Sequence, residues 1–175
     1  MDMEPLDFRQ IWNGADTFAQ FAEDATENQG LWSGVYRTTP IPDWAVEKIA
    51  GRGDGLRLLV VAEDWCGDAS NIVPVFGKLG DEAEGIEVRI ISRDDNLEVM
   101  DRYLTNGARS IPIAILLDSE FNEIGYWGPR PKELQQWVMD NKDRIPKEER
   151  FPLVRRWYAK DKGASTLREL LELLQ

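Results

Sequence analysis

The chain has 175 residues, a single cysteine, no histidine and a formal net charge of −11 at pH 7. This charge disfavours nucleic acid and anionic membrane surfaces as partners, and the lack of histidine excludes Cys-His and Ser-His catalysis and histidine metal sites. One cysteine cannot form an internal disulfide, no apolar run is long enough to cross a bilayer, and the first residues lack the basic and apolar regions of a signal peptide. We therefore expect a cytoplasmic protein.

Hydrophobic spacing predicts an alternation of helices and strands along the chain. Phe8, Trp12 and Phe18 belong to a helical stripe over residues 5–28, which Asn28-Gln29-Gly30 is expected to end. In chain order we expect a helix over 5–28, a loop over 31–42, a helix over 44–50, a strand over 56–63, a helix over 68–79, a strand over 86–92, a helix over 96–105, strands over 112–118 and 123–127, a helix over 132–141, a helical patch over 151–159 and a helix over 167–174.

Two local patterns refine this assignment. Asp43 is a candidate cap for the helix over 44–50, and Thr166 with Glu169 has the pattern of a capping box before the last helix. The tryptophans outside the Trp65 and Trp127 motifs are most simply explained as core residues: Trp12, Trp32, Trp44, Trp137 and Trp157.

The chain is organised around Trp65-Cys66-Gly67-Asp68-Ala69-Ser70, which joins a buried strand to a helix. At such a turn the unpaired helix N–H groups and the positive end of the helix dipole favour a thiolate, whereas the neighbouring carboxylates Glu63, Asp64 and Asp68 disfavour it. Cys66 could instead be a small buried hydrophobic residue. We favour a thiol that solvent can reach, and leave the direction of its pKa shift open.

Trp65-Cys66-Gly67 resembles the start of the thioredoxin active site, W-C-G-P-C. Pro74 matches the proline that kinks the active-site helix of that family, and Arg109-Ser110-Ile111-Pro112 before an apolar strand matches its cis-proline loop. The resemblance covers roughly residues 45–140.

The resemblance implies an α/β thioredoxin-like fold: a central mixed sheet of about four strands flanked by helices, the first two strands parallel and the last two antiparallel. We expect one domain over 1–175, with a core at about 45–140, an N-terminal helix within 1–30 and a C-terminal helical extension over 145–175. In the family the loop before the cis-proline faces the cysteine and pairs with extended substrate. Here Ile111 and Pro112 would hold that place in a groove with Trp65, Gly67, Asp68 and Ala69.

The chain departs from the family pattern at three positions. The second cysteine is Ala69, the active-site proline is Asp68, and the buried carboxylate is Val60. We interpret Asp68 as a first-turn residue that complements the helix dipole, although a local acid or partner contact is an alternative. Trp127-Gly128-Pro129-Arg130-Pro131 is interpreted as a turn, with a rim loop that offers its guanidinium to an anionic partner as the alternative.

These observations lead to two functional hypotheses. The first is monothiol redox chemistry, in which Cys66 forms a mixed disulfide with a protein or low-molecular-weight thiol or disulfide, with glutathione or another thiol as co-substrate. No other cofactor and no metal are expected, and the oligomeric state is left open. The second is a non-catalytic thioredoxin-fold module that binds a protein or peptide, which a slow, high-pKa Cys66 would favour. Either way, the lack of a resolving cysteine argues against a dithiol disulfide reductase.

Overall fold

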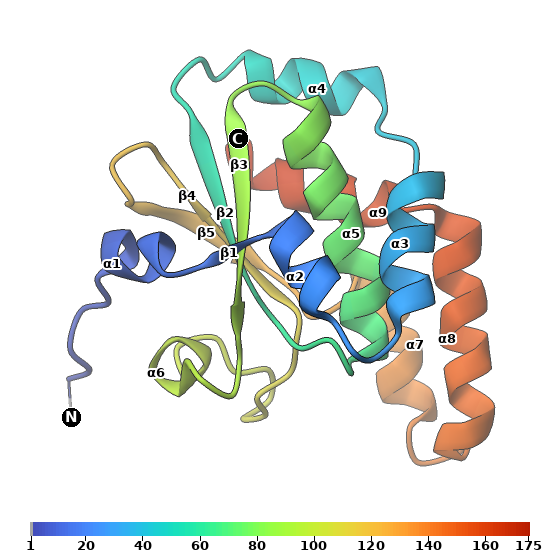
Figure 1. The fold of residues 1–175 in the computed structure, drawn as a ribbon. Coiled ribbons are helices and arrows are strands. Elements are labelled where there is room, and N and C mark those ends of the chain that lie inside the picture. Colours follow the sequence, from blue (N-terminus) through green and yellow to red (C-terminus); the bar gives the residue numbers. More distant parts are fainter. Residues whose placement is uncertain (1) are drawn as a thin grey trace.

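A computed structural model describes residues 2–175. Within them the chain forms one mixed sheet of five strands in the order β1-β3-β2-β4-β5 (Figure 1). Strand β2 pairs in parallel with β3 and antiparallel with β4, and β5 continues the sheet antiparallel to β4. The strands are β1 Asp16–Thr17, β2 Leu56–Ala62, β3 Ile86–Ser92, β4 Ile113–Leu117 and β5 Glu123–Trp127. The expected four-strand sheet is present, and the short β1 adds a fifth strand that runs antiparallel to β3.

Helices cover both faces of the sheet, more heavily on one side than on the other (Figure 1). The face with α1 and α6 is thinly covered, and α2, α3, α4, α5, α7, α8 and α9 lie on the opposite side. The helices are α1 Phe8–Asn13, α2 Phe18–Asp24, α3 Gln29–Thr38, α4 Asp43–Ala50, α5 Gly67–Glu82, α6 Leu97–Met100, α7 Lys132–Asn141, α8 Lys147–Asp161 and α9 Ala164–Leu171, followed by the 3₁₀ turn η1 Glu172–Leu174.

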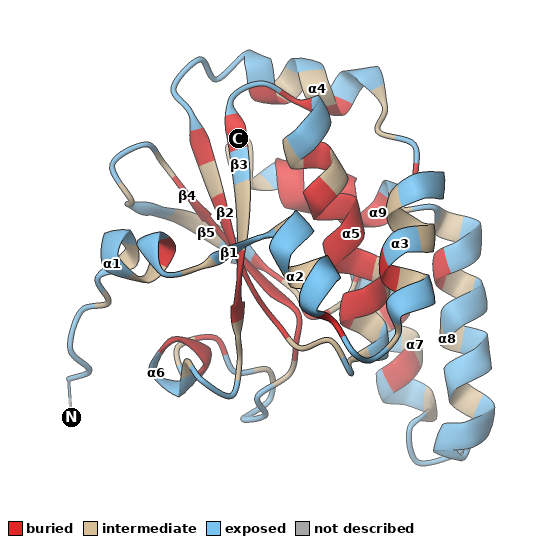
Figure 2. Ribbon diagram, viewed as in Figure 1, coloured by how far each residue is buried: buried red, intermediate tan, exposed pale blue. Residues whose placement is uncertain are grey.

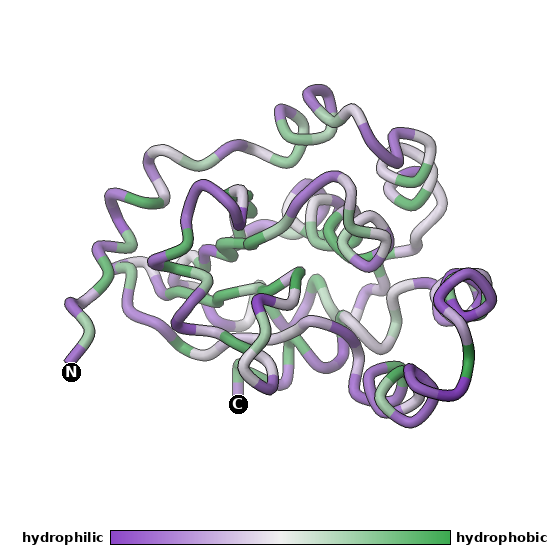
Figure 3. Tube along the Cα trace, turned by 90° about the horizontal axis from the view of Figure 1, so that it is seen from below, coloured by the Kyte–Doolittle hydropathy of each residue, from purple (hydrophilic) through white to green (hydrophobic). Residues whose placement is uncertain are grey.

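Strand β2 supplies both hydrophobic cores because it lies in the middle of the sheet. Leu58 and Val60 face the helix-rich side, whereas Leu59 and Val61 face α1 and α6, and all four are fully buried. Consecutive side chains of a strand point to opposite faces, so an unbroken apolar run is the pattern of a strand buried on both sides. Figure 2 shows this burial along the central strands and α5, and Figure 3 shows the apolar stretches inside a more hydrophilic exterior.

The helix expected over 5–28 is wrong as a single element. Helix α1 ends at Asn13 with Gly14 as its C-cap, β1 follows, and Thr17 caps α2 in a capping box with Gln20. The break has a physical reason: Trp12 packs in the core on the α1 side of the sheet, whereas Phe18 packs against the core on the opposite side. A single straight helix cannot reach both faces, so the chain crosses the sheet edge through β1.

The loop expected over 31–42 is also wrong, since α3 occupies residues 29–38. Trp32 is buried against the core and donates through its indole nitrogen to the Glu27 and Asp64 carbonyl oxygens. Tertiary packing of this face therefore outweighs the low helix propensity of Gly30 and Gly34.

Four smaller expectations are corrected. The helix expected over 96–105 keeps regular α-helical structure only from Leu97 to Met100. The last α-helix begins at Ala164, after Gly163 with φ +77°, so the predicted capping box is not formed. Instead, Glu169 accepts hydrogen bonds from the Trp127 indole and the Lys132 amide, tying α9 to the end of β5. Asp43 is the first residue of α4 rather than its cap, and Trp44 is exposed rather than part of the core.

Candidate functional site around Cys66

Cys66 lies at the N-cap of α5, where β2 has ended and the helix begins. Its Sγ accepts a hydrogen bond from the Ala69 amide at 3.4 Å and donates one to the Ile111 carbonyl oxygen at 3.6 Å. The half-buried side chain touches both hydrophobic cores, because it lies at the end of the sheet where the two faces meet. The strand-to-helix turn and the Ile111–Pro112 loop are therefore in direct contact at the thiol.

The structure brings together most of the residues expected to form a groove. Ile111 and Pro112 are buried beside the thiol, with the peptide bond between them in cis. Ala69 is fully buried in the first turn of α5, and Gly67 is exposed at the start of that helix. Trp65 lies at the rim, about half exposed, with the Arg93 guanidinium 4.9 Å from its ring centroid.

Asp68 has a much more specific environment than a helix-dipole role requires. Its carboxylate forms a bidentate ion pair with Arg130, in which Nε lies 3.0 Å from Oδ1 and Nη2 lies 2.9 Å from Oδ2. The Tyr158 hydroxyl donates to the same Oδ1 at 2.7 Å. Burial, followed by the charge of Asp68, raises the pKa of Tyr158, so this phenol remains a hydrogen-bond donor. Asp68, Arg130 and Tyr158 are called the Asp68 cluster below.

Asp68 lies in the first turn of α5, as expected, but the sequence did not predict its pairing with Arg130 or with Tyr158. The guanidinium of Arg130 is engaged by Asp68 and by the Gln135 side-chain oxygen, so this loop residue supports the turn that bears Cys66. Tyr158 comes from α8, ninety residues further along the chain than Asp68. No local sequence pattern pairs residues so far apart, which is why the cluster was not predicted.

The net electrostatic effect at Cys66 is a raised thiol pKa. Burial is the largest cause, the amide of Ala69 opposes it, and the negative charge of Asp68 raises the pKa further. Glu63 and Asp64, which the sequence also suggested as neighbours, instead accept hydrogen bonds from Ser92 and from the Thr26 amide, respectively. At neutral pH the site therefore holds mainly a protonated thiol.

Two positions that carry proton or electron transfer in thioredoxins are apolar here. Val60 lies in β2 and Ala69 in α5, and both are fully buried, with no exposed surface. Neither side chain can accept the thiol proton or resolve a disulfide. In the part of the chain that the structure describes, no group of three or more His, Cys, Asp or Glu side chains is placed to hold a metal ion. Over the same residues, no helix combines the length and apolarity needed to span a membrane.

Comparison with known proteins agrees with this geometry. Two solved structures share the fold over 97% of this chain and 98% of theirs: a protein of unknown function from Pseudomonas aeruginosa (19% identity, TM-score 0.76) and an HIV epitope scaffold (20% identity, TM-score 0.73). A search of curated proteins found no match. A thioredoxin family model matches residues 15–145. This range includes the Cys66 turn, the Ile111–Pro112 loop and all five strands. The chain therefore belongs to the thioredoxin family.

Proposed function

We propose that Cys66 performs monothiol redox chemistry through a mixed disulfide. The thiolate attacks a sulfur of a partner disulfide, a Cys66–partner S–S bond forms as the partner S–S bond breaks, and the other partner sulfur leaves as a thiolate. A second external thiol, such as glutathione, then attacks the partner sulfur and releases Cys66. The observation that carries this proposal is the position of the chain's single thiol at the N-cap of α5, against the Ile111 carbonyl.

The chemistry is expected to be slow at neutral pH. Only the thiolate is nucleophilic, and burial of Cys66 raises its pKa, so a small fraction of the protein is reactive at any moment. Ala69 provides no second thiol, so release from the mixed disulfide depends on the external thiol concentration. Protein disulfides and low-molecular-weight disulfides are both candidate partners.

The same burial favours a second candidate, a non-catalytic module that binds a protein or peptide beside Trp65 and the Ile111–Pro112 loop. Trp65 is about half exposed, and an exposed aromatic side chain is a common anchor in protein interfaces. In this alternative Cys66 serves packing, and its hydrogen bonds to Ala69 and Ile111 hold the two sides of the turn together.

Thiol reactivity distinguishes the two candidates. The rate of Cys66 alkylation by iodoacetamide is measured from pH 6 to 11, with urea-unfolded protein as the reference thiol and Cys66→Ser protein as the blank. In parallel, folded protein is incubated with glutathione disulfide, and the adduct is followed by mass spectrometry. Monothiol chemistry predicts a glutathione adduct on Cys66 that free glutathione removes. A folded protein that forms no adduct even at pH values where the reference thiol reacts fully would refute it and favour the binding module.

A further inference from the structure

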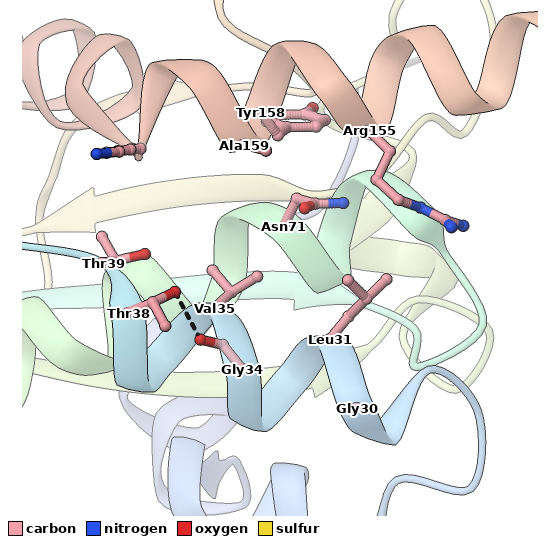
Figure 4. A pocket seen from close by; sticks show the side chains of 12 residues that line it. Gly30, Leu31, Gly34, Val35, Thr38, Thr39, Asn71, Arg155, Tyr158 and Ala159 are labelled. Atoms are coloured by element: carbon pink, nitrogen blue, oxygen red, sulfur yellow. Dashed lines mark hydrogen bonds between the residues drawn. The ribbon is translucent and has the colours of Figure 1, made fainter.

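A second concave site lies behind the Cys66 turn, between α3 and α8, with the start of α5 at its base (Figure 4). It consists of two adjoining cavities of about 560 and 90 Å³, which share Leu31, Asn71 and Arg155 as lining residues. Small-molecule sites usually enclose about 300–1,000 Å³. The combined cavity is called the α3–α8 cavity below.

The lining of the α3–α8 cavity is positively charged, although the chain as a whole carries −11. Four basic residues contribute to it: Arg130, Arg150, Arg155 and Lys162. Asp68 is the only carboxylate among the described lining residues, and it is already paired with Arg130. Arg150, Arg155 and Lys162 are therefore cationic lining residues without a carboxylate partner.

The lack of acidic partners for Arg150, Arg155 and Lys162 favours an anionic ligand. Within residues 2–175, Arg155 forms no side-chain hydrogen bond or ion pair, and the same holds for the Lys162 ammonium. Arg150 donates only to the Lys142 and Ile145 carbonyl oxygens, which leaves its charge uncompensated. A guanidinium at the mouth of a cavity is well suited to bind a carboxylate or a phosphate, because its N–H groups pair with two oxygens at once.

Apolar side chains form another part of the lining, beside the polar side chains of Thr38, Thr39 and Asn71. Leu31 and Val35 come from α3, and Val154, Phe151 and Val138 come from α8 and α7. Figure 4 shows Leu31 and Val35 on the α3 side, opposite Arg155 and Tyr158 on α8, with Asn71 of α5 between them. The lining thus combines apolar side chains with cationic residues, which suits an amphipathic ligand.

We propose that the α3–α8 cavity binds a small anionic amphiphile, a molecule with an apolar body and one carboxylate or phosphate. The head group pairs with Arg155, assisted by the charge of Arg150 or Lys162, and the body lies against Leu31, Val35 and Val154. This proposal goes beyond the thiol chemistry of Cys66. It does not require that chemistry, because none of the groups that it uses is the thiol.

The test uses two anionic probes, decanoate and decyl phosphate, and measures their binding to the full chain by titration calorimetry below their micellar concentrations. Decylamine replaces the anion by a cation, and inorganic phosphate lacks the apolar body. Both controls are expected to bind at least tenfold more weakly than the better anionic probe, because decylamine cannot pair with a guanidinium and inorganic phosphate has no apolar body to bury. Comparison of decanoate with decyl phosphate identifies the preferred head group.

Three variants locate the binding site. Arg155→Met removes the unpaired guanidinium, and is expected to weaken the anionic probe about tenfold or more. Gly34→Leu fills the cavity, since a Cβ at Gly34 meets no protein atom within 4 Å. The matched control Arg156→Met changes the next residue of α8, which lines neither cavity, and should bind the probes like the wild type.

Each remaining result overturns the proposal. Equal binding of decylamine, equal binding of inorganic phosphate, or no effect of Arg155→Met and Gly34→Leu would each show that the probes do not use this site as described. A dimer in solution that Gly34→Leu converts to a monomer would show that a second copy of the chain covers the cavity. All titrations are repeated with Cys66→Ser protein, and unchanged affinities there keep the outcome separate from that of the proposed thiol chemistry.

Discussion

Removing Arg130 tests whether the Asp68 cluster stabilises the turn that bears Cys66. The side chains of Arg130 and Asp68 are only 23% and 15% exposed, and Arg130→Met leaves the carboxylate with Tyr158 as its one remaining side-chain donor. Breaking a buried ion pair by removing one partner costs about 3–5 kcal/mol. Because both groups retain some contact with water, we expect a loss of about 2–3 kcal/mol in the free energy of unfolding.

For a chain of this size, that loss corresponds to a decrease in Tm of about 4–12 °C. The measurement is urea unfolding followed by tryptophan fluorescence, with Tm from calorimetry. Asp68→Asn/Arg130→Met removes both charges and is expected to be more stable than Arg130→Met alone, because no carboxylate remains uncompensated.

The chain offers a matched control in the ion pair between Arg109 and Asp101. It has the same bidentate geometry, with distances of 2.8 and 3.1 Å, but its side chains are 49% and 41% exposed. Exposed pairs contribute little, so Arg109→Met should lower the Tm far less than Arg130→Met. Equal losses for the two variants would refute the view that the Asp68 cluster is a structural support of the site.

Four further predictions address the thiol and the packing. Ala69→Cys should form an internal disulfide with Cys66 under mild oxidation, seen as the loss of both free thiols in the monomer; a protein that stays reduced or dimerises would contradict the thioredoxin-like turn. Folding raises the pKa of the Cys66 thiol, so the contribution of this thiol to stability is complete below the ordinary thiol pKa and is lost as the pH rises through the pKa of the folded protein. In alkaline urea titrations the wild type should therefore lose stability relative to Cys66→Ser. Gly77→Ala places a Cβ in the Phe18 ring and should cost about 1–3 kcal/mol by urea unfolding, but much less in a Phe18→Ala background. Deleting residues 1–30 should lower the Tm, since that segment supplies buried side chains to both cores, and an unchanged Tm would mean that it is a detached arm.

The sequence predicted best those elements whose hydrophobic spacing fits only one kind of secondary structure. Ile86–Ser92, Glu123–Trp127 and Lys132–Asn141 match the expected strands and helix residue for residue. The helix expected over residues 5–28 was wrong because helical spacing predicts an apolar stripe, but it does not show on which face of the sheet each part of that stripe packs. Helix α3 was missed because its glycines suggested a loop, whereas the burial of Trp32 is a tertiary effect.

The candidate site likewise contains residues that the sequence predicted and residues that it did not. Cys66, Ile111 and Pro112 were recognised because they belong to short motifs whose spacing carries the information. The partners of Asp68 were not recognised, because Arg130 in the loop between β5 and α7 and Tyr158 in α8 are 62 and 90 residues away and meet it only through tertiary packing. The unpaired charge of Arg155 was not predicted either, because no local sequence pattern shows that this residue lines a cavity.

The position of the carboxylate explains how this site differs chemically from a dithiol thioredoxin. The position that carries a buried acid in that family is Val60 here, and the nearby carboxylate is instead Asp68, in the first turn of α5. Its Oδ1 already accepts hydrogen bonds from Arg130 and Tyr158, and its Oδ2 lies 2.9 Å from Arg130 Nη2 in the ion pair, so it is poorly placed to take a proton from Cys66. Deprotonation of the thiol then falls to solvent, and reactivity should follow bulk pH with a midpoint set by burial. The charge of Asp68 raises the thiol pKa and that of Arg130 lowers it, so the Asp68 cluster does not act as an internal base for Cys66.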